Sequence, residues 1–285
     1  MKVSLVLATI HRTDDIGRLV ASLCVQTVRP WELIVVDQNV DDRVVPYVDQ
    51  ARSAGLAVQH LRLDKPNLSG ARNLGIACAS GDVVAFPDDD CWYEPDLIAQ
   101  VAQSFALHPS WSALVAQWVE RAQAQGGMAD DGQTLSATAW RNFRGGDASS
   151  ISLFMRATMF QTHGGFDERL GVGQWYGAGE ETDFVLRALS SGALIGRCGA
   201  VRVHHHFASP LEGQPGLHWR AALRRARGTG ALYVKHRLSL WVTLRGLFAP
   251  PITALAERRG CAALGLGLAA SLGRIQGACA WIFKR

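Results

Sequence analysis

Apolar and polar positions in the first part of the chain alternate between two spacings. Short runs rich in β-branched residues occupy residues 3–8, 33–36, 57–63 and 83–86. Between them, apolar residues recur at helical spacing over residues 14–26 and 69–79, and a further helical stretch starts after Glu94. This alternation is typical of a parallel β-sheet covered by helices. We therefore predict an α/β fold for this part of the chain.

The middle of the chain continues with a mixture of elements. Residues 112–119, 151–155 and 201–206 have the composition of strands, and residues 180–190 that of a helix. The segment 123–146 is polar and glycine-rich without a clear period, which predicts a functional loop. We expect one domain over residues 1–210 and a helical region over residues 211–285.

The C-terminal region has a different composition, both basic and apolar. After Pro215 aspartate is absent, and the basic residues Arg220, Arg224, Arg225, Arg227, Lys235, Arg237 and Arg245 alternate with apolar ones. The uncharged segment 261–273 is 13 residues long, which predicts that it is too short to span a bilayer. The composition favours an amphipathic segment at an anionic membrane surface. A helical appendage with a solvated basic face is the alternative.

Overall composition narrows the functional class only slightly. The chain has 285 residues and a net charge of +4, too small to indicate a nucleic-acid partner when no DNA- or RNA-binding motif accompanies it. Six scattered cysteines form no CxxC pair, so we expect reduced thiols. The N-terminal apolar run leads into Asp14 and Asp15, which predicts a strand rather than a signal peptide. The expected location is cytoplasmic, or peripheral on the inner face of the cytoplasmic membrane.

Three consecutive carboxylates, Asp88, Asp89 and Asp90, follow the apolar run 83–86. In an open parallel sheet the carboxyl ends of strands face the ligand-binding crevice. Carboxylates crowded there repel one another, and a divalent metal that also holds a diphosphate would neutralise both sets of charge. In an extended stretch Asp88 and Asp90 point to one side while Asp89 points aside. A solvated turn that caps the next helix is the alternative.

Another carboxylate, Asp37, ends the run "ELIVVDQN". A carboxylate at the tip of a buried strand commonly holds a ribose hydroxyl or a base edge, and a helix cap is the alternative. No GxGxxG motif follows the first strand and no GxxxxGK[ST] motif is present. These absences argue against a dinucleotide-binding Rossmann domain and a P-loop ATPase.

Several motifs, in order from Val3 to about His206, resemble the family 2 glycosyltransferases. They are "LATIHR", "LIVVDQNVDD", "NLSGARNLGIACASGDVVAFPDDD", "GGFDERL" and "GEETDFVLRA". The third is the most specific, because it matches the ARNxG helix and the DxD strand end of that family. The resemblance implies a GT-A fold, with a Rossmann-like, mostly parallel sheet flanked by helices. It also implies an inverting enzyme that uses Mg²⁺ or Mn²⁺ and a nucleoside-diphosphate sugar donor.

The resemblance assigns residues to the donor site. The implied nucleotide-sugar-binding residues are Thr9, Arg12, Asp37, Asn39, Arg72, Asn73, Asp88 and Asp89. Asp88 and Asp90 form the DxD motif, with Asp90 as the direct metal ligand. A histidine from this region sometimes completes the metal shell in GT-A enzymes; in "VRVHHHF", alternation aims His204 and His206 at one side. His206 is our first candidate, and a polar strand end is the alternative.

The catalytic base is implied to lie at the start of "GEETDFVLRA". Most relatives read Glu-Asp there, whereas this chain has Glu180 and Glu181, with Asp183 two residues further on. Glutamate can act as a general base because its ordinary pKa is close to that of aspartate. We predict Glu181 as the base, with Glu180 and Asp183 as substitutes. Trp175 and Tyr176, in the preceding glycine-rich loop, are predicted to bind the acceptor; core anchoring is the alternative for Trp175.

The predicted function is transfer of a sugar to an acceptor hydroxyl, in exopolysaccharide, lipopolysaccharide or glycolipid assembly. The expected acceptor is lipid-linked or a saccharide. One alternative is a metal-dependent nucleotidyltransferase, which would release pyrophosphate instead of a nucleoside diphosphate. The other is a catalytically silent sugar-nucleotide-binding module, which the missing aspartate at the base position suggests.

Overall fold

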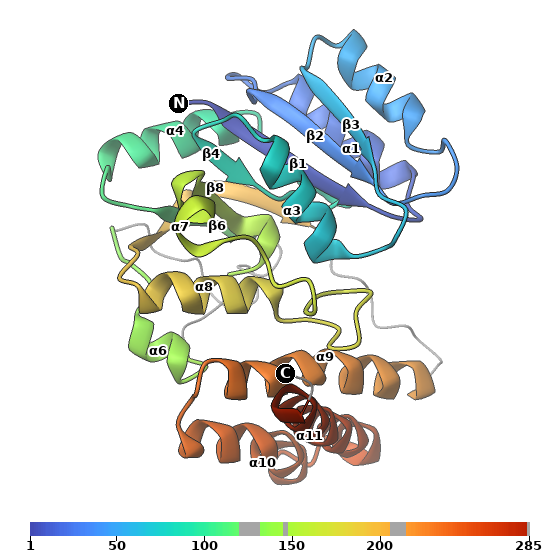
Figure 1. Cartoon of the computed structure of the whole chain (residues 1–285), viewed down its shortest axis with the longest axis vertical. Helices are drawn as coiled ribbons and strands as arrows, with labels where there is room; N and C mark the ends of the chain where they lie inside the picture. The colour runs from blue at the N-terminus through green and yellow to red at the C-terminus, as the bar shows by residue number, and fades with distance from the viewer. Residues whose placement is uncertain (120–131, 145–147, 206–214, 284–285) are drawn as a thin grey trace.

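The computed structural model describes residues 1–119, 132–144, 148–205 and 215–283. Its centre is an eight-stranded sheet in the order β3-β2-β1-β4-β7-β6-β8-β5, with a layer of helices at one end of the molecule (Figure 1). The strands are β1 Val3–Thr9, β2 Glu32–Asp37, β3 Val58–Arg62, β4 Val83–Ala85, β5 Cys91–Tyr93, β6 Ala113–Trp118, β7 Leu153–Arg156 and β8 Ile195–His205. The predicted α/β class is confirmed.

Helices cover both faces of this sheet. They are α1 Asp14–Cys24, α2 Val45–Ser53, α3 Leu68–Cys78, α4 Leu97–Leu107, α7 Thr158–His163 and α8 Glu180–Ser190. The side chains of β1 show why two layers are needed. Leu5 and Leu7 join the core that contains α1 and α4, whereas Val6 joins the opposite core, which contains residues of α3 and α8. Both faces of β1 are therefore buried, as expected for a strand inside a parallel sheet.

The strand pairings bring the predicted site to one edge of the sheet. Strands β3, β2, β1 and β4 run parallel, and so do β6 and β8. Strand β7 is antiparallel to β4 and β6, and β5 is antiparallel to β8. The carboxyl ends of β1, β2 and β4 therefore lie together, which is where the acidic triplet follows β4.

The sequence pattern predicts most of these elements closely, and α8 has the predicted bounds. It does not predict α2, α7 or β5; β5 is only three residues long, too short for an alternation to be visible. The segment expected as a loop contains a short helix, α6 Ala137–Arg141. Residues 123–131 and 145–146 of that segment lie outside the described residues. Strand β8 begins at Ile195, earlier than the predicted start at residue 201.

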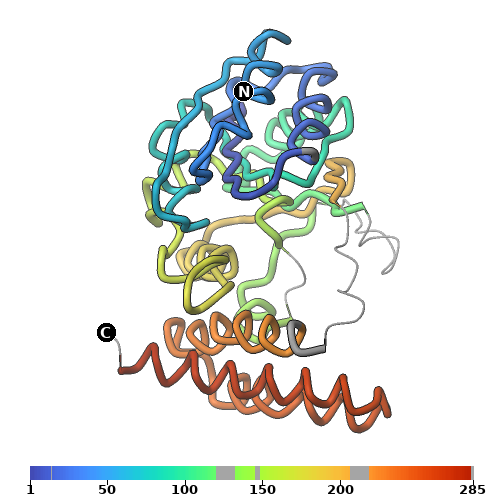
Figure 2. Tube along the Cα trace, turned by 90° about the vertical axis from the view of Figure 1, so that its right-hand side faces the viewer, coloured from blue at the N-terminus to red at the C-terminus, as the bar shows by residue number. Residues whose placement is uncertain are grey.

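The C-terminal region forms α9 Pro215–Lys235, α10 Leu240–Ala256 and α11 Gly260–Phe283, a layer at one end of the molecule (Figures 1 and 2). Its expected helical character is confirmed. In Figure 1, α8 lies between this layer and the sheet. Helix α11 approaches α9 closely because glycines leave room at the contact. A Cβ on Gly277 would lie 1.9 Å from the backbone oxygen of Arg227. Any larger residue at this position would push the two helices apart.

The expectation that the apolar C-terminal segment is too short to span a bilayer is wrong. That expectation rests on residues 261–273, whereas α11 has 24 residues. Among the described helices, α11 is long and apolar enough to cross a membrane, and 28% of its most apolar window is buried. Length and apolarity do not distinguish a spanning helix from one that lies along a surface.

Candidate functional site

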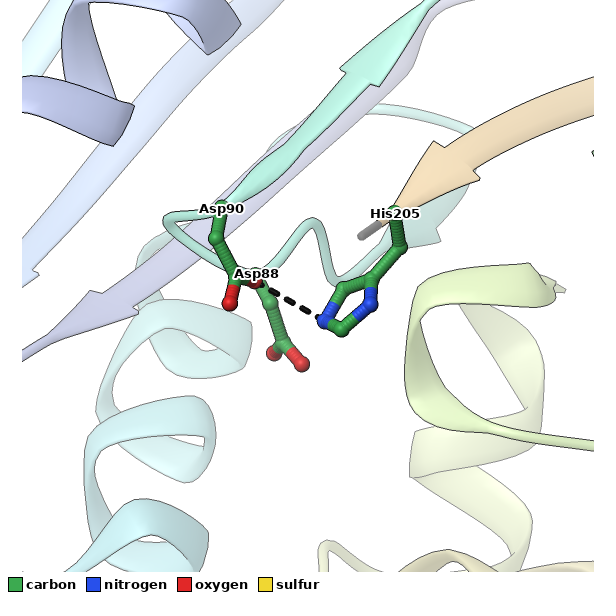
Figure 3. A group of neighbouring side chains, drawn as sticks. All are labelled: Asp88, Asp90 and His205. Carbon is green, nitrogen blue, oxygen red and sulfur yellow. Dashed lines mark ion pairs between the residues drawn. The ribbon is translucent and has the colours of Figure 1, made fainter. Parts of the chain in front are cut away.

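Two carboxylates and one imidazole meet at the junction of β4, β5 and β8 (Figure 3). Asp88 and Asp90 belong to the turn between β4 and β5, and His205 ends β8. Because Cys91 pairs with His205 across β5 and β8, the preceding Asp90 reaches the imidazole. Its Oδ1 lies 2.9 Å from Nε2 of His205. One ligand atom from each of Asp88, Asp90 and His205 lies within 4.8 Å of the others.

This donor set fits a divalent cation. Carboxylate oxygens and imidazole nitrogens are both common metal ligands. Burial raises the pKa of Asp88, and the neighbouring charge of Asp90 raises it further, while Arg72 acts in the opposite direction. A cation between the two carboxylates would relieve this repulsion. The residues present can therefore hold Mg²⁺ or Mn²⁺.

Asp89 is turned toward β1, away from the imidazole. Its Oδ2 accepts a hydrogen bond from Thr9 Oγ1 at 2.8 Å, and its Oδ1 lies 3.3 Å from Nε of Arg12. Burial raises the pKa of Asp89 to about 6. Burial also acts to raise the pKa of Asp90, but His205 and Arg12, which both pair with it, lower that pKa overall. Thr9 and Arg12 thus hold Asp89 toward β1, while Asp90 pairs with His205 and Arg12.

A cavity of about 420 Å³ opens beside the triplet. Of the predicted residues it is lined by Arg12, Asp88 and Asp89, and its other walls are Ala8, Ile10, His11, Gln38, Pro66, Asn67, Leu68, Val172 and Gly173. Its size and mixed lining are typical of a small-molecule site. Sequence analysis misses Gln38 and Asn67. The signal for Asn67 is its position before α3, where its side chain caps the helix by accepting from the N–H of Gly70.

Asp37 and Asn39 are buried and do not line this cavity. One oxygen of Asp37 accepts hydrogen bonds from the backbone N–H and Nδ2 of Asn39, at 2.9 and 2.7 Å. The other oxygen lies 3.0 Å from Nε2 of His60 and 3.2 Å from Arg62. Asn39 in turn accepts from the N–H of His11 at 2.7 Å. Asp37 and Asn39 therefore support the cavity wall through His11. Their direct contact with a nucleotide stays a prediction.

Arg72 connects the acidic triplet to the predicted base helix. Its guanidinium is buried and lies 3.3 Å from Oδ1 of Asp88 and 3.1 Å from Oε1 of Glu180. Asn73 points elsewhere: its amide donates to the carbonyl of Phe166 at 2.9 Å and accepts from the same residue's N–H at 2.8 Å. Arg72 therefore lies in the site, whereas Asn73 holds the loop that contains Phe166.

Helix α8 opens with the two candidate bases. Gly179 precedes it with a φ of 103°, a left-handed conformation that suits glycine. Glu180 is buried and paired with Arg72, whereas Glu181 is partly exposed. Burial and the nearby charge of Glu180 raise the pKa of Glu181 to about 8. Once ionised, a carboxylate with such a pKa is a stronger proton acceptor than an ordinary one.

Asp183 faces the C-terminal layer instead of the cavity. Its fully buried carboxylate lies 2.7 Å from Nζ of Lys235 and 2.8 Å from Nε2 of His236. On the other oxygen, Nε of Arg187 lies 3.0 Å away. Burial acts to raise the pKa of Asp183, but these partners lower it overall. Both oxygens are paired, so this side chain joins α8 to the end of α9.

The two predicted acceptor residues also lie against the C-terminal layer. Tyr176 is buried, with its ring 5.3 Å from that of Trp281 in α11. The ring of Trp175 lies 4.4 Å from the guanidinium of Arg227 and is 43% exposed as a residue. With Arg169, Gln174 and Trp281 they line a cavity of about 270 Å³. Tyr176 therefore anchors the core, and Trp175 alone presents substantial aromatic surface.

His206 lies outside the described residues, so its role as a ligand stays a prediction. The histidine that meets the carboxylates is His205, which sequence analysis misses. His204 points the other way, with Nε2 3.1 Å from Oε1 of Glu94 and its ring stacked on Trp92. The sequence limits the candidate imidazole ligand to three consecutive histidines, but the register between β5 and β8 determines which of them faces the carboxylates.

Part of the chain is similar to known glycosyltransferase sequences. Residues 4–128 match the model of "Glycosyl transferase family 2". The chain is 33% identical over 103 residues to "Uncharacterized glycosyltransferase YwdF" of Bacillus subtilis, covering 36% of this chain and 38% of the relative. It is 31% identical over 127 residues to a glucosyl-dolichyl phosphate glucuronosyltransferase of Haloferax volcanii, covering 42% and 41%. The matches thus span less than half the length of either relative.

Two solved structures share the fold over nearly the whole chain. The mannosyltransferase PcManGT from Pyrobaculum calidifontis, in complex with GDP-Man and Mn²⁺, aligns with a TM-score of 0.67 and 15% identity over 100% of this chain and 88% of its own. S. aureus TarS 1-349 aligns with a TM-score of 0.60 and 15% identity over 97% and 92%. At this identity the alignments show the fold alone. The shared fold confirms the predicted GT-A fold, and residues 4–128 confirm the resemblance to the family 2 glycosyltransferases over that part of the chain.

Proposed function

We propose that this chain is an inverting, metal-dependent glycosyltransferase that uses a nucleoside-diphosphate sugar. The observation that carries the proposal is the grouping of Asp88, Asp90 and His205 within 4.8 Å, beside a cavity of about 420 Å³. Solved structures of the same fold support it, because one contains GDP-Man and Mn²⁺ and another UDP-GlcNAc. Crowded carboxylates at a strand end match the needs of a metal-bound diphosphate.

In the proposed mechanism the donor diphosphate occupies the cavity next to the triplet. Asp88, Asp90 and His205 would hold Mg²⁺ or Mn²⁺, which when bound supplies positive charge to the departing diphosphate. Arg12 lines the cavity and pairs with Asp90 and Asp89. Its planar guanidinium can bind a phosphate oxygen pair in the same way. Arg72 keeps Asp88 in position while it also fixes Glu180 on the base helix.

The proposed base is Glu181. Its carboxylate takes the proton of the acceptor hydroxyl as that oxygen attacks the anomeric carbon, and the nucleoside diphosphate leaves from the opposite face. One displacement inverts the anomeric configuration. Oε1 of Glu180 is paired with Arg72 at 3.1 Å, and its Oε2 is buried without a hydrogen-bond partner among the described residues. An acceptor hydroxyl therefore reaches the buried Glu180 less readily than the partly exposed Glu181. Asp183 is paired on both oxygens, which favours a structural role for it.

The proposed acceptor is lipid-linked or a saccharide, and the proposed process is exopolysaccharide, lipopolysaccharide or glycolipid assembly at the cytoplasmic side of a membrane. The partly exposed ring of Trp175 beside a cavity of about 270 Å³ supports a sugar acceptor near the base helix. The basic and apolar C-terminal layer supports a membrane location. One curated relative carries glucosyl-dolichyl phosphate in its name.

The test is to identify the product. The full chain is incubated with a panel of nucleoside-diphosphate sugars and Mn²⁺, and the released nucleotide and pyrophosphate are quantified separately. We expect a nucleoside diphosphate, from hydrolysis or transfer. Release of pyrophosphate would replace the proposal with a nucleotidyltransferase. Saturable donor binding without either product, in the presence of saccharide and lipid-linked acceptors, would favour a silent binding module.

A further inference from the structure

Within the C-terminal layer, hydrogen bonds from side chains of α11 hold α10 in place. Helix α10 continues through the proline pair 250–251, although each proline removes an N–H that would bond the carbonyl four residues earlier. Those carbonyls belong to Gly246 and Leu247. Arg274 of α11 donates a hydrogen bond to the first, and Ser271 of α11 donates to the second. The polar side chains of α11 therefore repair the break in α10 and bind the two helices together.

A basic groove of about 620 Å³ lies between these two helices. Its charged lining consists of Arg245, Arg259 and Arg274, and its apolar lining includes Val242, Ala249, Pro250, Ala263, Leu266 and Ala270. Among the described residues Arg259 pairs with Glu257, while the Nη groups of Arg245 and Arg274 reach only backbone carbonyls. The buried Nε of Arg274 has no hydrogen-bond partner in the described part of the chain. Two of the three cations in the groove, Arg245 and Arg274, thus lack an anionic partner among the described residues.

The net charge of the layer reinforces this imbalance. Between Pro215 and Phe283 the sequence has ten arginine or lysine residues and a single acidic residue, Glu257. Arg237 and Arg258, at the two ends of α10, are both exposed. Such a one-sided charge distribution attracts an anionic surface.

Both α10 and α11 also present a row of apolar side chains to the solvent. On α10 they recur every three or four residues, at Trp241, Leu244, Phe248, Ile252 and Leu255, and on α11 at Leu268, Leu272, Ile275 and Ile282. Trp241 is 68% exposed and Phe248 58%. The polar residues of α11 point inward instead, since Gln276 accepts from Nε of Arg227 at 2.9 Å. A helix facing water would present the reverse pattern.

We propose that the groove between α10 and α11 binds the anionic phosphate headgroup of a membrane lipid, while the exposed stripes of both helices lie in the membrane surface. Guanidinium groups form paired hydrogen bonds with phosphate, and basic helices with one apolar face lie in the interface. A spanning α11 would have to give up the contacts of Arg274 and Gln276 with its neighbours. The inference deepens the membrane location proposed above, but it does not require transferase activity.

The experiment measures co-sedimentation of the full chain with vesicles of phosphatidylcholine alone and of phosphatidylcholine with an equal amount of phosphatidylglycerol. We expect more than about tenfold tighter binding to the anionic vesicles, lost at high salt. Arg274→Gln and Arg259→Gln should each weaken that binding about fivefold. The second variant removes only an exposed pair, so it keeps the test valid if the first is poorly folded. Trp241→Ser with Phe248→Ser should reduce binding to both vesicles more than about tenfold.

Leu107→Ser is the matched control, because Leu107 is 69% exposed at the end of α4 and should leave vesicle binding unchanged. Equal binding to neutral and anionic vesicles, or arginine variants that bind as well as the parent, would overturn the proposal. Competition by millimolar inorganic phosphate would reassign the groove to free phosphate. Resistance to alkaline extraction would show a spanning α11 instead. The vesicle assays contain no nucleotide-sugar donor, so a failure to bind vesicles would not count against the proposed transferase activity. Conversely, a failure to release nucleotide in the product assay would not count against the lipid site.

Discussion

Two carboxylates in this protein, the fully buried Asp183 and the partly exposed Asp88, are compensated to different extents. Asp183 pairs with Lys235, Arg187 and the imidazole of His236 at 3.0 Å or less, and its pKa is lowered despite its burial. Among the described residues Asp88 forms an ion pair with Arg72, at 3.3 Å, which it shares with Glu180. Burial and repulsion from Asp90 raise the pKa of Asp88. The charge of Asp183 is already compensated by its partners, whereas an added cation would stabilise the ionised form of Asp88.

This difference indicates that the balance of charge around a carboxylate, together with its access to solvent, separates a structural group from a functional one. Both groups belong to sequence motifs that the family resemblance makes candidates for the active site. Only the three-dimensional partners separate them. The following predictions test whether the distinction holds.

The largest effect is expected from Asp90→Asn. Loss of one carboxylate from the cluster removes a metal ligand, and the metal's contribution of several kcal/mol to leaving-group stabilisation corresponds to at least about a thousandfold in turnover. The measurement is the initial rate of nucleoside diphosphate release. Asp49→Asn, at an exposed carboxylate on α2, is the control and should keep the parent rate. A turnover within a few-fold of the parent would remove Asp90 from the site.

Asp183→Asn should act mainly on stability. Removing one partner from a buried ion-pair network costs about 3 kcal/mol, measured by urea unfolding. Because the pKa of Asp183 is lowered in the native protein, its pairs stabilise the fold above the unfolded carboxyl pKa of about 4. That contribution is lost as the pH falls through the lower native pKa. The stability difference between parent and variant should therefore shrink in acid. Unchanged stability with abolished turnover would instead make Asp183 the base.

Glu181→Gln should reduce turnover about a hundredfold without weakening donor binding. Since the pKa of Glu181 is raised to about 8, the carboxyl group is mostly protonated and inactive below that pH. The parent rate should therefore rise with pH toward about 8 and level off above it, and the variant should lose this rise. Glu180→Gln is the matched comparison on the same helix turn. A pH profile that persists in Glu181→Gln and disappears in Glu180→Gln would exchange their roles.

The smallest effect is expected from His205→Gln. Glutamine can still donate a hydrogen bond toward Asp90 but offers no imidazole nitrogen, so metal affinity should fall about tenfold. Titration of Mn²⁺ into the protein in the presence of GDP measures this. His204→Gln, which loses only the contact with Glu94 at 3.1 Å, should bind Mn²⁺ as the parent does. Equal affinities in the two variants would place the third ligand elsewhere.

The sequence predicts the parts of the site that depend on local geometry. Alternation in an extended segment predicts the division of Asp88 and Asp90 from Asp89, but the structure achieves it in a turn, where the N–H of Cys91 bonds the carbonyl of Asp88 at 3.2 Å. The bounds of α8 follow from its helical pattern. His205 is different. Its position opposite Cys91 depends on the register of β5 with β8, a pairing across more than a hundred residues that no local pattern encodes.

Long-range contacts also explain the other differences. The partners of Asp183 come from the end of α9 and cannot be inferred from the motif that contains it. The proline pair 250–251 predicts the end of a helix, yet α10 continues because Arg274 and Ser271 supply the missing donors. In each case a side chain from a distant element replaces what the local sequence lacks.

The central claim is that Asp88, Asp90 and His205 hold a metal that binds the donor diphosphate. Isothermal titration of UDP and of GDP into the full chain, with and without Mn²⁺, tests it most directly when repeated with Asp88→Asn and with Asp49→Asn. The account predicts Mn²⁺-dependent binding of at least one nucleotide by the parent and by Asp49→Asn, and loss of that dependence in Asp88→Asn. Nucleotide binding that is equally tight without Mn²⁺, or unchanged in Asp88→Asn, would contradict it.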